Sequence, residues 1–388
     1  MPMLRTAFTD MVGVDLPIAG FNRSPAVVAA VCNAGGLGVL AASGYRPDEL
    51  DAQLTWIEEQ TGGRPYGVDL LIPEKFAAGD PGNLVASLRA QIPDEHLAFV
   101  RGLLDKYGVP ARPAPPARPP ARPASGDRAE EFWASVSPAG AESLLDAAFS
   151  HRIALIASAL GTPPPDLVER GHAAGVVVAA LVGAPKHAER QLAAGVDLLI
   201  AQGTEAGGHT GTIATMVLTP EVVALAGGRP VLAAGGIASG AQMAAALALG
   251  AAGVWCGSVW LSSHEDVANQ AIKAKFLAAT SADTVRSRAR TGKPARQLRS
   301  AWFDEWERAG SPDPLPLPLQ PMLVSDAWSR IDAAADAGHE GALALQSFFV
   351  GQVVGSFREL RPAAEITRQL AADCERRIAD LARLTQPG

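Results

Sequence analysis

The chain has 388 residues, a hydrophobic fraction of 48%, an aromatic fraction of 5% and a formal net charge of −7. That length suits one large α/β barrel or two ordinary domains, with small aliphatic side chains providing most of the core. The acidic balance argues against nucleic acid as a partner, because binding to phosphates needs clustered Lys and Arg. No apolar run approaches the ~20 residues that a membrane span needs.

The three cysteines, Cys32, Cys256 and Cys374, lie far apart in the sequence. Their odd number and wide spacing favour neither a disulfide framework nor a metal site. The first five residues lack the apolar stretch of a signal peptide. We therefore expect a cytoplasmic protein with a small-molecule substrate, no bound metal, and neither nucleic acid nor membrane as partner.

Eight short apolar runs punctuate the chain, and most are followed by a helical pattern. Runs that are apolar throughout are typical of parallel strands buried on both faces. Eight such units predict a closed (β/α)8 TIM barrel, with an open doubly wound sheet as the alternative. The eight runs are residues 16–20, 37–43, 66–72, 153–158, 176–182, 198–203, 230–236 and 253–261.

Several helices carry explicit start and stop signals. Ser24 and Pro25 predict an N-cap and a first helical residue after the first strand. A second helix is expected over 47–59. Ser239 is expected to cap a third helix, which follows the seventh strand.

Two stretches interrupt the strand–helix rhythm. Residues 109–124 are too rich in proline for a helix or a central strand, because each proline lacks an N–H. Residues after the eighth strand contain helical patterns and a second proline cluster, and we interpret them as a lid over the barrel mouth. The predicted division is a barrel with C-terminal helices over 1–73, 140–264 and 340–388, a Pro-rich helical and linker insertion over 74–139, and a helical lid over 265–339.

The segment Gln202–Gly211 directly follows the sixth strand, where barrel enzymes carry catalytic groups. Its glycines allow the backbone to approach a flat ligand, and His209 can accept a proton near neutral pH. A histidine with a purely structural role on a Gly-rich turn is the alternative. The neighbouring loops favour a catalytic His209.

Two glycine turns follow the seventh and eighth strands. Gly235 and Gly236 lie where a strand runs into a helix, so backbone N–H groups and the positive helix end can face an anion. Gly257 and Ser258 offer further donors from the adjacent strand. The two loops together predict a phosphate site of the kind that recurs in TIM barrels.

These motifs, together with residues 34–38 and 65–69, resemble the nitronate monooxygenases, formerly called 2-nitropropane dioxygenases. They are also similar to the flavin-dependent enoyl-acyl-carrier-protein reductases of the same superfamily. The resemblance implies an FMN-dependent oxidoreductase with His209 as catalytic base. It implies FMN contacts at Gly20, Phe21, Asp69, Gln202, Gly207, Gly208, Gly235, Gly236, Trp255, Cys256, Gly257 and Ser258.

The sequence departs from the family pattern at several points. Asp69 stands where the family often has Asn, and an ionised carboxylate cannot donate a hydrogen bond. Its negative charge would also disfavour an anionic reduced flavin. The first loop, 19–24, lacks the usual Ala-Pro-Met, and the fourth loop, 158–163, lacks the usual Phe. These positions shape the pocket, so the sequence predicts the cofactor more specifically than the substrate.

Three functions remain open at this point. The first is oxidation of a nitronate or nitroalkane with O2. The second is reduction of an enoyl thioester or quinone with NAD(P)H, in which basic residues of the lid would bind a pyrophosphate. The third is a flavin-binding subunit without turnover, against which the intact 205–209 block argues. The basic residues are Arg286, Arg288, Arg290, Lys293, Arg296 and Arg299.

Overall fold

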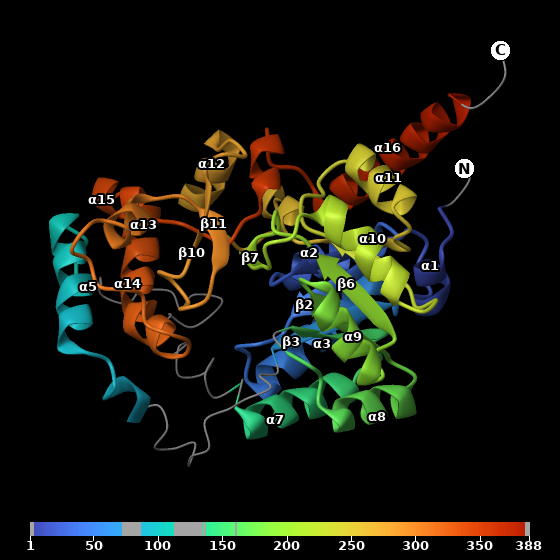
Figure 1. Ribbon diagram of the computed structural model, residues 1–388, viewed down its shortest axis with the longest axis horizontal. Coiled ribbons are helices and arrows are strands. Elements are labelled where there is room, and N and C mark those ends of the chain that lie inside the picture. Colours follow the sequence, from blue (N-terminus) through green and yellow to red (C-terminus); the bar gives the residue numbers. More distant parts are fainter. Residues whose placement is uncertain (1–3, 72–86, 112–134, 136, 160, 385–388) are drawn as a thin grey trace.

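The computed structural model describes residues 4–71, 87–111, 135, 137–159 and 161–384 (Figure 1). Eight parallel strands close into a barrel, which confirms the predicted TIM-barrel fold. In order around the barrel they are β1 (Ile18–Asn22), β2 (Leu37–Ala41), β3 (Tyr66–Leu71), β4 (Leu155–Ala159), β5 (Val177–Val182), β6 (Leu198–Gln202), β8 (Val231–Ala234) and β9 (Gly253–Cys256).

The strand boundaries lie within two residues of the prediction, except for the end of the eighth strand, which lies five residues earlier. The first strand begins at Ile18, where its pairing with Val254 of β9 begins, and so lies two residues later than the apolar run. The eighth strand ends at Cys256, because the apolar residues after it form a 3-10 helix, η1 (Ser258–Ser262). Composition alone does not distinguish a short apolar helix from the continuation of a strand.

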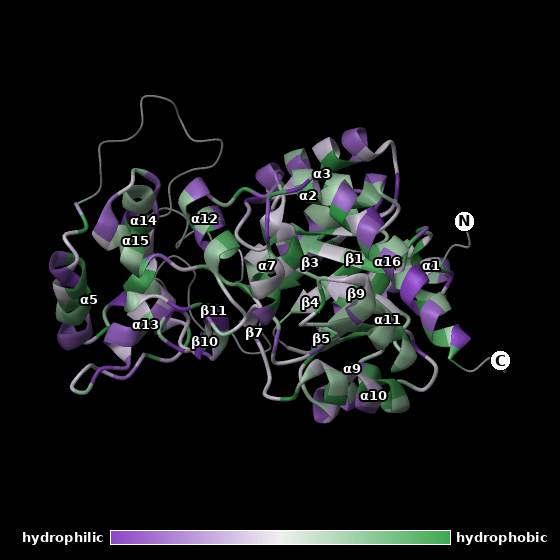
Figure 2. Ribbon diagram, turned by 90° about the horizontal axis from the view of Figure 1, so that it is seen from above, coloured by the Kyte–Doolittle hydropathy of each residue, from purple (hydrophilic) through white to green (hydrophobic). Residues whose placement is uncertain are grey.

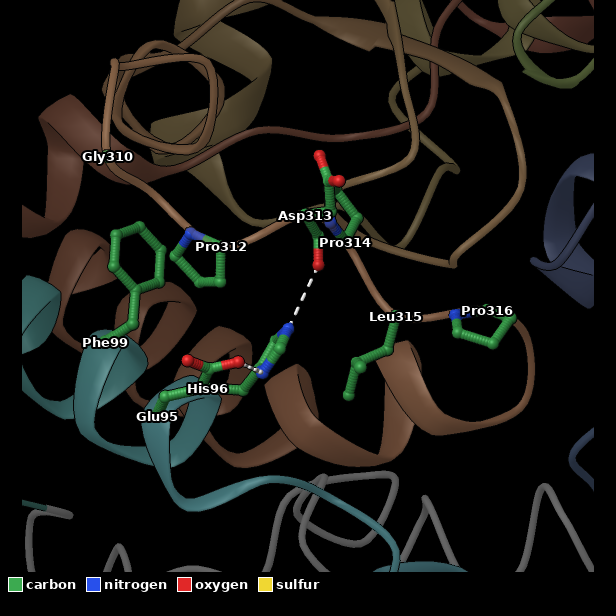
Figure 3. Close-up of a pocket in the computed structure, with 9 residues that line it drawn as sticks. All are labelled: Glu95, His96, Phe99, Gly310, Pro312, Asp313, Pro314, Leu315 and Pro316. Carbon is green, nitrogen blue, oxygen red and sulfur yellow. Dashed lines mark hydrogen bonds and ion pairs between the residues drawn. The ribbon is translucent and has the colours of Figure 1, made fainter.

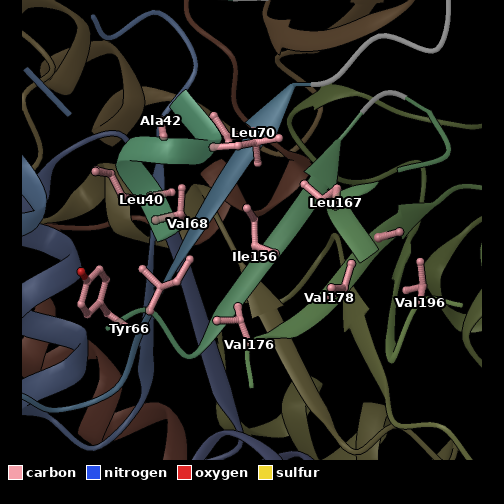
Figure 4. Close-up of a cluster of buried hydrophobic side chains, with 14 of the residues drawn as sticks. Leu40, Ala42, Tyr66, Val68, Leu70, Ile156, Leu167, Val176, Val178 and Val196 are labelled. Atoms are coloured by element: carbon pink, nitrogen blue, oxygen red, sulfur yellow. The ribbon is translucent and has the colours of Figure 1, made fainter. Parts of the chain in front are cut away.

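Side chains alternate between the barrel interior and the surrounding helices, as expected for strands. Val68, Ile156 and Val178 are in register on β3, β4 and β5 and pack outward in one buried cluster (Figure 4). Leu155 and Ala157 belong to a separate interior cluster, which also contains Phe8 of the N-terminal helix α1 (Ala7–Val12).

Eight helices of the described chain cover the outside of the barrel. They are α2 (Pro25–Asn33), α3 (Pro47–Thr61), α7 (Pro138–Phe149), α8 (Pro165–Ala174), α9 (Pro185–Ala193), α10 (Thr215–Leu225), α11 (Gly240–Ala248) and α16 (Ala363–Arg383). Ser239 caps α11 as predicted, its hydroxyl accepting from the Gln242 N–H. Ser24 occupies the N-cap of α2, but its hydroxyl donates to the Glu265 carbonyl at 2.7 Å and makes no cap hydrogen bond.

A second lobe lies beside the barrel, with β7 and β11 between the two (Figure 2). Its elements are α5 (Asp94–Lys106), α12 (Gln270–Ala278), α13 (Ala301–Trp306), α14 (Leu319–Asp336), α15 (Glu340–Leu345), η2 (Gln352–Ser356) and a sheet ordered β10 (Thr284–Ser287), β11 (Ala295–Leu298), β7 (Gly208–His209). Leu103 of α5 and Trp328 of α14 belong to one apolar cluster. Leu103 lies in the predicted insertion 74–139, whereas Trp328 lies in the predicted lid 265–339. The domain limits themselves remain a prediction.

Two further expectations concern the proline-rich stretch and membrane-spanning segments. Most of the proline-rich stretch 109–124 lies outside the described residues. Among the helices that the structure describes, none is long and apolar enough to cross a membrane.

Candidate functional site

The carboxyl ends of the barrel strands bring together residues from distant motifs. Asp69 of β3 is in register with Ala157, and Gln202 of β6 with Ala234. Both alanines belong to the interior cluster, so Asp69 and Gln202 face the inside of the barrel at its mouth. Trp255 of β9, in register with Ala234, belongs to the same cluster.

Asp69 is a buried carboxyl group with 5% exposure. Among the described residues its side chain has no hydrogen-bond or ion-pair partner. Burial raises the pKa of Asp69 to about 7, because the ionised form loses its hydration. A protonated Asp69 can donate a hydrogen bond, which the ionised form expected from the sequence cannot.

His209 lies in the short strand β7, which pairs with β11 of the second lobe. Its Nδ1 atom is buried and has no hydrogen-bond partner among the described residues. Burial lowers the pKa of His209, and the charge of Lys293 acts in the same direction, whereas a hydrogen bond with the backbone of Pro294 opposes both. The imidazole is therefore neutral at pH 7 and keeps one nitrogen available for a proton or a ligand.

The two glycines before His209 are required for different reasons. A Cβ on Gly207 would lie 2.8 Å from the carbonyl carbon of Val350, so this glycine allows the 350–351 backbone to pack against the loop. Gly208 has φ of 78° with open space around it, so backbone conformation alone favours glycine there. The expected approach of these glycines to a cofactor stays a prediction.

The loop after β8 has the geometry of an anion cradle. Gly235 and Gly236 have φ of 90° and 73°. The N–H groups of Gly236 and Ile237 have no acceptor among the described residues. The N-terminus of α11 follows directly, so its positive end reinforces the attraction for an anion.

The loop after β9 adds to this cradle. The N–H groups of Gly257 and Ser258 also find no acceptor in the described part of the chain. The Ser258 hydroxyl accepts a hydrogen bond from the Gly351 N–H at 2.8 Å. Cys256 is buried, and burial raises the pKa of its thiol to about 12, so it remains a neutral packing residue.

The first loop contributes an aromatic wall. Phe21 and Trp255 are stacked, with ring centroids 5.8 Å apart and an interplanar angle of 25°. Gly20 faces the other way: a Cβ there would lie 2.8 Å from Val31 of α2. Packing of β1 against α2 therefore already accounts for this glycine.

Sequence reasoning missed the support for these loops. The Glu205 carboxylate accepts from the Thr215 N–H at 3.0 Å and lies 2.9 Å from its hydroxyl, which joins the loop after β6 to the start of α10. The Glu205 carbonyl accepts from the Gln352 N–H at 2.9 Å. A Cβ on Gly351 would lie 2.6 Å from that carbonyl oxygen. The glycine inside the apolar run 348–354 was the only signal for this contact.

A second support joins the first loop to the lid. The Asn22 amide donates to the Asp266 carboxylate at 2.9 Å, and both side chains are buried. No apolar pattern predicts a polar pair between residues 244 positions apart. Within the described residues, no cluster of three or more His, Cys, Asp and Glu could hold a metal ion.

The site fits the FMN that the sequence resemblance implies. Four backbone N–H groups without acceptors in the described chain lie on two adjacent loops, where a single phosphate could bind. The interior-facing Asp69, Gln202 and Trp255 line the mouth next to them.

Comparisons with known proteins agree with this geometry. The family model described as nitronate monooxygenase matches residues 5–373. A Mycobacterium tuberculosis protein, provisionally named a monooxygenase, is 53% identical over 387 residues, covering 99% of this chain and 100% of its own length. A Rhodococcus jostii dehydrogenase of a hydroxylated octahydro-indene-4-carboxyl-CoA is 30% identical over 423 residues, covering 99% of both chains. Nitroalkane oxidase from Streptomyces ansochromogenes superimposes with a TM-score of 0.75 at 28% identity, over 97% of this chain and 100% of that one.

Proposed function

The chain belongs to the nitronate monooxygenase family of oxidoreductases, and we propose that it is an FMN-dependent enzyme that oxidises a nitronate, or its parent nitroalkane, with O2. The structural similarity to a nitroalkane oxidase supports this assignment. The observation that carries it is the neutral imidazole of His209 at the barrel mouth, whose buried Nδ1 has no hydrogen-bond partner in the described chain.

The cofactor would be held by the two cradle loops and the residues at the barrel mouth. Gly235, Gly236, Gly257 and Ser258 would bind its phosphate through backbone N–H groups. Asp69, Gln202 and Trp255 would contact it from the barrel, with Gly20, Phe21, Gly207, Gly208 and Cys256 completing the surroundings. When bound, FMN would accept an electron pair from the substrate and pass it to oxygen.

His209 would act on the substrate and leave cofactor affinity unchanged. A nitroalkane carries an acidic proton on the carbon next to the nitro group, and a neutral imidazole can remove it. The lowered pKa keeps His209 in the form that accepts a proton. A preformed nitronate has already lost that proton, so His209 would only orient it.

The segment 265–339 would act as a lid that completes the site. The pairing of β11 with β7 supports this proposal, because it ties the lid to the strand that carries His209. The buried Asn22–Asp266 hydrogen bond supports it at the end of β1.

A second function is reduction of an enoyl thioester or a quinone with NAD(P)H. The named substrate of the Rhodococcus jostii relative is a CoA thioester, and that relative matches almost the whole chain. The basic residues of β10 and β11 would then bind a phosphate-bearing ligand.

Anaerobic stopped-flow of the flavin-loaded protein separates the two functions. Bleaching of the flavin absorbance by a nitronate is the result that we expect. Bleaching by NADH or NADPH but not by nitronate would favour the reductase. A flavin that none of these reduces would contradict both and favour a binding subunit without turnover.

A further inference from the structure

We infer that the pocket beside the β10–β11 hairpin binds the diphosphate of an adenine nucleotide, carried by either a CoA thioester or NAD(P)H. The pocket has a volume of about 530 Å³, and arginines 286, 288 and 308 line it. This site goes beyond nitronate oxidation, which needs no nucleotide, and it would serve the second function.

Arg286 is the central group because its charge is uncompensated. It lies directly opposite Arg296 in the antiparallel pair β10–β11. Burial lowers the pKa of Arg296, and the repelling charge of Arg286 acts in the same direction. Arg296 donates to the Thr204 carbonyl at 2.8 Å and to the Thr284 hydroxyl at 3.0 Å.

Arg286 has no such partner in the part of the chain that the structure describes. Its Nε is buried without a hydrogen bond, and among the described residues its side chain forms no ion pair. An unpaired, partly buried guanidinium is costly unless an anion binds to it. Phosphate is the anion whose geometry the guanidinium fork matches best.

Two neighbours are placed to share the same anion. Arg288 donates to the carbonyls of Gly292 and Pro314, both at 3.2 Å, which fixes its guanidinium at the pocket wall. The indole Nε1 of Trp306 is buried and has no acceptor among the described residues. Both groups are donors only, so they favour a ligand rich in acceptor oxygens.

The charges around the pocket are not all positive. Glu307 and Asp313 also line it, and the exposed Arg308 forms an ion pair with the buried Glu305 at 3.1 Å. Arg286 and Arg288 form no ion pair with a described carboxylate, so they are the pair available for two phosphoryl groups.

The surroundings of the pocket suit a nucleotide. A second pocket of about 630 Å³ adjoins it and shares Asp313 and Pro314 with it. Phe99 of α5 and Pro312 line this second pocket, which offers apolar walls for a planar base (Figure 3). Each pocket falls in the size range of small-molecule sites.

Pro294 connects the arginine pocket to the proposed base. Pro294 lines the pocket, and its backbone also hydrogen-bonds the His209 ring. A nucleotide whose diphosphate lies on Arg286 would therefore have its reactive end on the side of His209. A thioester acyl group and a nicotinamide ring are the two reactive ends that such a ligand could carry.

Isothermal titration calorimetry of the FMN-loaded protein tests this site with acetyl-CoA, NADPH, NADH and ADP as probes. We expect ADP to bind, and either acetyl-CoA or a nicotinamide nucleotide to bind more tightly. Arg286→Gln should weaken that binding roughly tenfold or more, since a charge-assisted hydrogen bond is lost. Arg299→Gln is the matched control, because Arg299 pairs with Asp304 and does not line the pocket.

The results separate this inference from the proposed oxidation. Tighter binding of acetyl-CoA identifies a thioester substrate, and tighter binding of NADPH or NADH identifies a reductant; either outcome supports the site. No binding of any probe, or equal affinity in both variants, overturns it. Turnover of a nitronate, which carries no phosphate, should be unchanged in Arg286→Gln, so failure of the nucleotide site leaves the oxidation intact.

Discussion

Ala295 of β11 lies directly opposite His209 of β7 in an antiparallel pair. β7 belongs to the loop after the sixth barrel strand, whereas β11 belongs to the segment between the eighth strand and the C-terminal helix. The position of the proposed base is therefore set by contact between the barrel and the second lobe. A change that separates these two segments should reduce activity before it releases the cofactor.

Gly207→Ala would disturb this arrangement through the neighbouring segment 349–351, because Phe349 is bridged to Gln297 of β11. The added Cβ would lie 2.8 Å from the carbonyl carbon of Val350, so the 350–351 backbone must shift. We expect kcat/KM for the substrate to fall by roughly 10²-fold, as for other misplacements of a catalytic group by about 1 Å. Steady-state kinetics and flavin absorbance measured on the same sample check this expectation.

Gly208→Ala is the control for Gly207→Ala. It places a side chain at φ of 78° but in open space. The strain should cost about 1–2 kcal/mol of stability with little effect on the lobe contact. Equal losses of activity in both variants would show that packing against Val350 does not position His209.

Asp69→Asn should remove a pH-dependent destabilisation. The buried carboxyl has its pKa raised from 3.8 to about 7, so the folded state favours the protonated form. The destabilisation is absent below the unfolded-state pKa, grows as the pH rises, and is complete above about 7. By pH 8 it amounts to roughly 4 kcal/mol.

Urea unfolding of wild type and Asp69→Asn at pH 5 and pH 8 measures this effect. The variant should gain stability over wild type, and the gain should be larger at pH 8. The control variant is Asp105→Asn, at an exposed position of α5. Its difference in stability from wild type should be the same at pH 5 and pH 8. A gain for Asp69→Asn that is the same at both pH values contradicts the raised pKa.

Gly236→Val should empty the cradle while the barrel still folds. Gly236 has φ of 73°, which a β-branched residue rarely adopts, and a Cβ there already contacts Glu205 at 3.4 Å. The backbone N–H groups of this turn should move away from the phosphate. We expect circular dichroism close to wild type and little bound flavin after purification.

Gly227→Val provides the matched control for this turn. Gly227 has φ of 59° near the end of α10, and a Cβ added there would meet nothing within 4 Å. The substitution imposes similar backbone strain away from the site, and the variant should keep its flavin. Full flavin occupancy in Gly236→Val would show that the phosphate binds at another loop.

The sequence predicts the barrel well because each strand is a local feature. An apolar run between turn residues identifies a buried strand without knowledge of its neighbours. The cap of α2 shows the limit of local reasoning. Ser24 has the right residue type and position, yet its hydroxyl bonds to Glu265, which lies 241 positions away in the chain.

In the candidate site, too, local features could be predicted from the sequence and long-range contacts could not. His209 and the glycine turns stand out because their residue types are unusual after a strand. The groups that hold them do not stand out: Glu205 on Thr215, Gly351 against the loop, and Asn22 on Asp266 are long-range contacts. A single sequence carries no pattern for such pairs, since neither partner alone has a distinctive spacing.

The role of His209 can be tested by the contrast between a nitroalkane and its nitronate. We expect His209→Asn to retain FMN, because in the proposed site the imidazole would face the substrate, whereas the cradle loops would hold the phosphate. Proton removal from the nitroalkane should slow by ~10²–10⁴-fold, the usual contribution of a positioned base. The preformed nitronate needs no proton removal and should lose far less.

The most direct measurement is therefore anaerobic single-turnover reduction of the flavin in wild type and His209→Asn, with each substrate form in turn. We expect a large loss of rate for the nitroalkane and a small one for the nitronate, at equal flavin occupancy. Equal losses for both forms would make His209 a binding group, and no loss for either would give it a purely structural role.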